Sequence, residues 1–115
     1  MNAAKATARW VLSNKLRTVK MAILEELEEL VHGIQNDTDA RPHLRKFHQR
    51  IFHHLRDLQS WPTSPRINVA TMRIKNILDI LRSCLMETRK DKNHHTIENI
   101  PLTRIRIILK ARQIS

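Results

Sequence analysis

Apolar residues in the first third of the chain recur at steps of three and four positions, which is the period of one face of an α-helix. The sequence therefore predicts a helix over about residues 3–34, with Gly33 and Asn36 as stop signals. At 1.5 Å per residue this helix would be about 45–50 Å long, whereas a globule of this size has a radius of gyration of about 13 Å. We expect the helix to overhang its own chain, so its apolar stripe needs another surface. The stripe consists of Leu12, Leu16, Val19, Ile23, Leu27, Leu30 and Ile34.

The charges of this first helix are ordered with bases before acids, from Lys15, Arg17 and Lys20 to the glutamates at 25, 26, 28 and 29. That order is the reverse of the one that the helix dipole favours. It is compatible with a solvated charged face, or with an antiparallel copy of the same helix that sets each basic half against an acidic half. The second interpretation predicts a homodimer. Its interface would be Leu12, Leu16, Val19, Ile23, Leu27 and Leu30.

A second helix is expected from about Arg41 to Ser60, with Asp39 as its N-cap and Pro42 in its first turn. The Trp-Pro and Ser-Pro pairs within residues 61–65 end it and make a turn. Its spacing predicts one core face. That face consists of Leu44, Phe47, Ile51, Leu55 and Leu58.

A third helix is expected to start at Ile67 or Asn68 and to continue to about Thr88. Residues 89–95 read as a polar linker, and residues 100–114 are ambiguous because LTRIRI alternates like a strand while Leu102, Ile105 and Leu109 suit a helix. We expect a basic tail over 93–115 that is disordered or a short helix, after a helical domain over 1–92. The inward residues of the third helix are expected to be Val69, Ile74, Ile77, Leu78, Leu81 and Leu85.

Composition favours the same all-α class. The 115 residues include one glycine and no tyrosine, and hairpin turns need residues that tolerate positive φ. We therefore predict an elongated bundle with three main helices per chain, paired as an antiparallel dimer of four-helix type. Cys84 is the single cysteine, which fits a reducing compartment. With no secretory signal and no segment long enough to span a bilayer, the expected location is the cytoplasm.

The net charge of +10 is concentrated in the later part of the chain. Residues 1–40 hold five basic and six acidic side chains, a balance of −1, and residues 41–115 hold sixteen and five, a balance of +11. A field of this sign attracts polyanions such as nucleic acid, acidic membrane or an acidic protein.

Enzyme and metal chemistry find little support in the sequence. The histidines at 43, 48, 53 and 54 do not place two rings on adjacent turns of one helix face, so no zinc pair is expected. There is no glycine-lined phosphate loop or nucleophile elbow. We expect a binding protein without a catalytic site, a cofactor or a small-molecule substrate.

A basic, hydrogen-bonding stripe lies beside the core face of the second helix. Such a row on a packed helix would reach phosphates and 2′-hydroxyls across the shallow minor groove of A-form RNA, reading shape rather than sequence. With two Trp and two Phe, the chain is too poor in aromatics for single-strand recognition by stacking. An ordinary solvated cationic face is the alternative. The nucleic-acid-binding residues are predicted to be Arg41, Arg45, His48, Gln49 and Arg56, beside Phe52, with Arg66 and Arg73 from the third helix.

Over residues 21–72, the chain resembles the small silencing suppressors of nodaviruses. The resemblance rests on AILEELEELV in the first helix, HLRKFHQRIFHHLRDL in the second and SPRINVAT at the start of the third. It implies a viral, helical homodimer in the host cytoplasm that binds double-stranded RNA without sequence preference and hides it from host silencing. Alignment on Pro65 puts Arg56 at the position of an RNA-contacting arginine. Ser64 departs from the lysine that some members carry.

Three functions therefore remain open from the sequence. Sequestration of double-stranded RNA accounts best for the charge, the stripe and the resemblance. A viral accessory or adaptor protein that binds an acidic host protein, such as an interferon antagonist, is the second. A peripheral membrane binder is the third, although the apolar faces have the Leu and Ile spacing of packing seams.

Overall fold

Four helices make up the chain in the computed structural model, which describes the backbone of residues 3–36, 39–90 and 95–115 and the side chains of 7–36, 39–86 and 103–115. The all-α class predicted from the sequence is confirmed, with four helices in place of three. They are α1 (Ala3–Gln35), α2 (Arg41–Gln59), α3 (Pro65–Lys90) and α4 (His95–Arg112).

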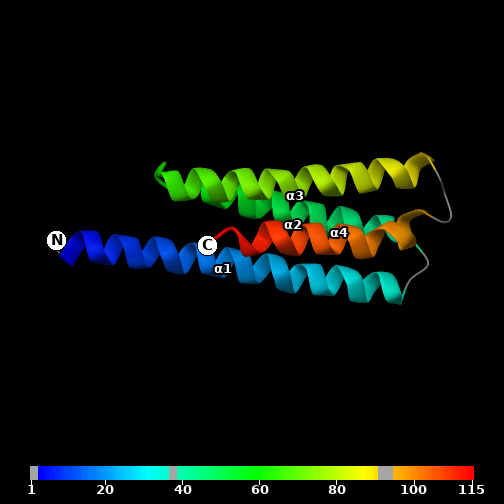
Figure 1. Ribbon diagram of the computed structural model, residues 1–115, viewed down its shortest axis with the longest axis horizontal. Coiled ribbons are helices and arrows are strands. Elements are labelled where there is room, and N and C mark those ends of the chain that lie inside the picture. The colour runs from blue at the N-terminus through cyan, green and yellow to red at the C-terminus, as the bar shows by residue number, and fades with distance from the viewer. Residues whose placement is uncertain (1–2, 37–38, 91–94) are drawn as a thin grey trace.

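The helices alternate in direction and form a ring in which each packs against its neighbours in sequence and α4 closes against α1. Figure 1 shows α3 on the side of the bundle opposite α1, with α2 and α4 between them. The molecule is elongated, 58 × 22 × 19 Å, and its radius of gyration of 16.0 Å exceeds that of a sphere of this size. A single chain therefore makes the four-helix arrangement that the sequence analysis expected from two.

The apolar stripe of α1 lies in the core of the single chain. Leu16 and Ile23 are fully buried, and Leu12 is half-buried. The sequence interpretation assigned this stripe to a second copy, whereas α2 and α4 of the same chain pack against α1. The first turns of α1 do overhang the bundle (Figure 1), and there Trp10 is 68% exposed. The stripe residues that lie in the core are Leu16, Val19, Ile23, Leu27, Leu30 and Ile34.

The predicted core face of α2 is confirmed, since all five of its residues are buried. The predicted cap is displaced by one position: Ala40 is the N-cap and makes no side-chain cap bond. The Asp39 carboxylate nevertheless accepts the backbone N–H of Arg41 at 3.1 Å, so it satisfies one free donor of the first turn.

Helix α3 begins two or three residues earlier than expected because Pro65 occupies its first position, where a missing N–H costs nothing. The Ser64 hydroxyl accepts the backbone N–H of Ile67 at 3.2 Å and caps this end. The assignment of Val69 to the core was wrong, because it is 41% exposed. The buried face consists of Ile67, Ala70, Ile74, Ile77, Leu78, Leu81 and Cys84, with Leu85 partly buried.

The C-terminal tail is an integral helix of the bundle. Ile107, Ala111 and Ile114 are buried, with spacings of four and three, whereas Ile105 and Leu109 are more than half exposed. The face predicted from Ile105 and Leu109 was therefore wrong, and the strand-like alternation of LTRIRI hid the true one. The side chain of Leu102 lies outside the described residues.

Gly33 does not end α1, which continues to Gln35, and its φ is not positive. Its missing side chain instead allows close packing of α1 against α2: a Cβ at this position would lie 2.7 Å from Nδ1 of His43. The stop-signal interpretation of Gly33 was therefore wrong, and the glycine serves a close approach between helices.

Two isoleucines of α4, two positions apart, test whether this helix belongs to the folded unit. Ile107→Ala should lower the free energy of unfolding by about 2–5 kcal/mol, because it leaves a cavity in the core. Ile105→Ala, at a position 53% exposed, should change it by about 0.5 kcal/mol or less. Urea unfolding followed by circular dichroism measures both, and equal small effects would show that α4 does not share the core.

Candidate nucleic-acid interface

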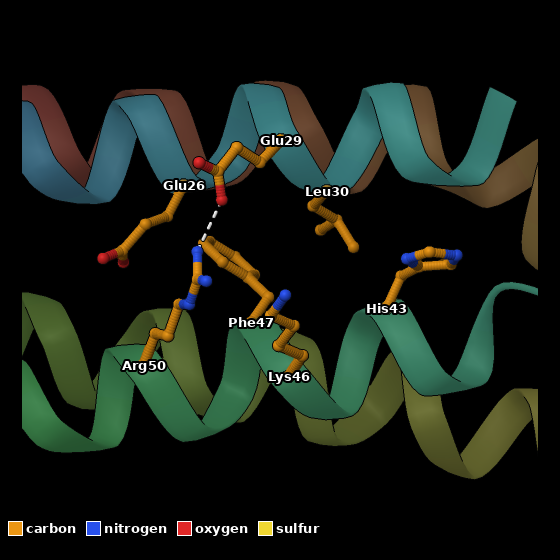
Figure 2. A pocket seen from close by; sticks show the side chains of 7 residues that line it. All are labelled: Glu26, Glu29, Leu30, His43, Lys46, Phe47 and Arg50. Atoms are coloured by element: carbon orange, nitrogen blue, oxygen red, sulfur yellow. Dashed lines mark hydrogen bonds and ion pairs between the residues drawn. The ribbon is translucent and has the colours of Figure 1, made fainter. Parts of the chain in front are cut away.

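Three of the four glutamates of α1 pair with bases on the two helices that flank it. The Arg50 guanidinium of α2 donates to Glu29, as Figure 2 shows, and Nε2 of His54 lies 3.1 Å from both carboxylate oxygens of Glu26. On the other flank, Arg104 of α4 donates to Glu28. Glu29 and Glu28 thus neutralise Arg50 and Arg104 on the α1 side of the bundle, a role that the sequence interpretation gave to a second chain.

The basic half of α1 also has an acidic partner within the chain. Lys15 forms an ion pair with Asp57 near the end of α2. Its ammonium lies 5.7 Å from the centroid of the Trp61 ring, within range of a cation–π contact. Asp57, an acid of α2, is therefore engaged toward α1 and does not reduce the charge of the outer α2 surface.

The hollow between α1 and α2 shown in Figure 2 has a volume of about 60 Å³. Small-molecule sites occupy about 300–1,000 Å³, so this one is too small for a substrate, and paired charges of both signs line it. Among the described side chains, no group of three His, Cys, Asp or Glu is placed to hold a metal ion. The residues that line the hollow are Glu26, Glu29, Leu30, His43, Lys46, Phe47 and Arg50.

The outer surface of α2 carries most of the predicted stripe. Arg45, Gln49 and Arg56 are exposed, and the Arg56 guanidinium lies 6.0 Å from the centroid of the exposed Phe52 ring. Arg41 is half-buried, and its Nε atom is buried without a hydrogen-bond partner. The structure therefore brings Arg41, Arg45 and Arg56 onto one side of α2, away from α1, whereas Arg50 faces α1.

His48 lies at the seam between α2 and α3. Burial lowers its pKa below the ordinary value of 6.5, and the nearby Arg82 guanidinium of α3 lowers it further. Both effects disfavour the charged ring, so His48 is neutral at pH 7 and offers hydrogen bonds rather than charge. Since the folded pKa is below the unfolded one, protonation of His48 costs stability as the pH falls below about 6.5.

A second set of cations at this seam comes from α3. Arg82 lies beside His48, and Lys75 is exposed two turns earlier on the same side of α3. Asp79 is 3.8 Å from Arg82 and offsets part of this charge. Sequence reasoning missed Lys75 and Arg82 because only the antiparallel pairing of α3 with α2 shows which side of α3 joins the stripe.

Arg66 and Arg73, the two arginines of α3 that were predicted to bind nucleic acid, lie on the side of α3 opposite to Lys75 and Arg82. Arg66 donates to the Ser13 hydroxyl of α1 at 2.8 Å, and Arg73 donates to the side-chain carbonyl of Gln113, directly after α4. They are therefore separated from the α2 stripe by the width of α3. The two groups of cations lie on either side of one helix.

No protein-family model, curated protein or solved structure matches the chain. None of the helices, over the residues described, is long and apolar enough to cross a membrane.

Proposed function

We propose that the protein binds double-stranded RNA, without sequence preference, through the face formed by α2 and α3. One observation carries the proposal: cations gather on the α2–α3 face, while glutamates of α1 are engaged along the α1 seams. Glu26, Glu28 and Glu29 of α1 pair along the α1 seams, and Asp79 is the acid on the α2–α3 face among the described side chains. The cations of this face are Arg41, Arg45, Arg56, Lys75 and Arg82, with His48 between them.

The length and straightness of the arginine row fit a duplex. Arg41 and Arg56 are fifteen residues apart, or about 22 Å along a straight helix. A rigid row of guanidinium groups follows a phosphate backbone and forks onto its oxygens. Contacts of this kind position a protein on the duplex without reading base sequence.

The exposed aromatics argue against single-strand recognition. Trp10 lies on the overhanging start of α1, and Phe52 lies near the middle of α2. Stacking of successive bases needs several rings along one groove, and these two rings are far apart in the fold. The α2 arginines are also fixed on a packed helix, which suits a regular duplex better than a flexible strand.

Binding along a duplex would hide it from nucleases, so silencing suppression by sequestration is part of the proposal. Its support is the resemblance to nodavirus suppressors over residues 21–72. The homodimer stays a prediction, and its interface must lie outside the buried stripe of Leu16 to Leu30. Exposed positions remain for it on α1 and α4.

A binding panel tests the function. Labelled RNA duplex, DNA duplex of the same sequence, single-stranded RNA, a polyglutamate peptide and anionic vesicles are titrated at one ionic strength. The duplex RNA should bind most tightly, and its affinity should fall steeply with salt because neutralised phosphates release counterions. Tighter binding to single-stranded RNA would contradict the proposal, and preference for polyglutamate or vesicles would favour an acidic protein or a membrane as the partner.

Arg56 and Arg50 form a matched pair on α2. Arg56→Gln should weaken duplex binding by about ten-fold or more, since a hydrogen bond to a charged group contributes about 1.5–3 kcal/mol. Arg50→Gln removes the same charge from the side that faces Glu29 and should cost much less, with at most about 1 kcal/mol of stability. Fluorescence anisotropy measures binding, and equal losses would reduce the explanation to diffuse charge.

A further inference from the structure

Helix α3 lies between two rows of cations, on the side of the bundle opposite α1 (Figure 1). Its α2 side is identified by Arg82, which lies beside His48. Its α4 side is identified by Arg73, which donates to Gln113. Since α3 packs against both α2 and α4, its own outer surface separates the two rows.

The row on the α4 side includes residues that the sequence analysis did not assign. Gln113 marks the side of the C-terminal segment that faces α3. Arg106 and Lys110 precede it by seven and three residues, so they lie on the same side of α4. Arg104 lies on the other side, where it donates to Glu28 of α1, and Arg112, eight residues later, shares that side.

The outer surface of α3 between these rows is almost neutral. Met72 is 51% exposed, with the exposed Asn68 about one turn before it and the exposed Ser83 about three turns after it. Asp79 is the acid on this surface among the described residues, and it is offset by Arg82. We call this surface the α3 ridge, which consists of Asn68, Val69, Met72, Asn76 and Ser83.

We propose that the α3 ridge is the part of the protein that enters the minor groove of duplex RNA. In this arrangement, cations on the α2 side contact the phosphates of one strand, and Arg73, Arg106 and Lys110 contact those of the other. This inference rests on the proposed function and specifies that binding occurs between α3 and the minor groove.

Dimensions and chemistry both support this placement. Neighbouring helix axes are about 8–10 Å apart, so the two cation rows flank the ridge closely. The A-form minor groove is wide and shallow and is edged by 2′-hydroxyls. The amides of Asn68 and Asn76 and the hydroxyl of Ser83 can donate hydrogen bonds to these groups and accept hydrogen bonds from them. A helix about 10–12 Å across with its side chains does not fit the B-DNA minor groove, which is about 6 Å wide. The ridge therefore favours RNA over DNA.

Two methionines of nearly equal exposure provide the test. Met72 on the ridge is 51% exposed, and Met21 on α1 is 49% exposed. Met72→Glu would place a carboxylate among the phosphates and should weaken duplex RNA binding by about ten-fold or more. Met21→Glu makes the same change in charge and side chain on the opposite helix and should leave the affinity within about two-fold. Circular dichroism and urea unfolding confirm that both variants fold.

A second pair of variants tests the α4 row through the salt dependence of binding. Arg106→Gln with Lys110→Gln removes two phosphate contacts and should reduce the slope of log affinity against log salt by about two. Arg17→Gln with Arg112→Gln removes the same charge from α1 and the α1 side of α4, and should leave the slope unchanged.

The outcomes separate the two proposals. If wild-type protein binds duplex RNA and Met72→Glu binds as tightly as Met21→Glu, the ridge is wrong and the proposed function stands. Equal slopes for the two double variants would likewise overturn the α4 row. If wild-type protein does not bind duplex RNA, both proposals fall.

Discussion

The packing of α1 between α2 and α4 brings its glutamates against basic side chains of both neighbours. Glu29 and Glu26 hold Arg50 and His54 of α2, and Glu28 holds Arg104 of α4. Arg50 and Arg104 would otherwise add to the positive surface of the bundle. Because these glutamates lie on the second half of α1, the arginines that they pair with add less positive charge to that side of the bundle.

These ion pairs affect the distribution of surface charge more than the stability of the fold. Exposed pairs contribute about 0–1 kcal/mol each, whereas burial of a large apolar side chain contributes about 1.5–3 kcal/mol. The fold therefore depends on its shared core, in which Ile23 of α1, Ile51 of α2, Ile77 of α3 and Ile107 of α4 are all fully buried. That core fixes the rotation of each helix, and the rotation decides which charged side chains meet acids and which meet solvent.

The spacing of apolar residues correctly predicted the buried face of those helices that have a single apolar stripe. The stripes of α1 and α2 are of this kind, and their residues are buried as expected, apart from Leu12, which is half-buried. In α4, apolar residues at alternate positions equally suit a strand or another helical face, so the buried face around Ile107 was missed. Because α4 was not predicted as a helix of the bundle, no segment of the same chain was expected to pack against the whole apolar stripe of α1. The stripe was therefore assigned to an interface with a second copy of the chain.

The candidate interface was predictable only in part for the same reason. Arg45 and Arg56 share a face of one helix, which spacing alone reveals. Lys75 and Arg82 join them through the antiparallel pairing of α2 with α3, and Arg106 and Lys110 face the far side of α3 through its pairing with α4. Such relations between helices depend on rotation and packing, which the period of a single helix does not contain.

The central claim is that a polyanion meets the side of the bundle opposite α1. A map of backbone amide chemical shifts during titration with a short RNA duplex tests this directly. The account predicts that the largest changes fall on residues 45–56, 68–83 and 106–110, while the acidic segment 25–32 of α1 changes little. Changes on 25–32 as large as those on α3 would contradict it.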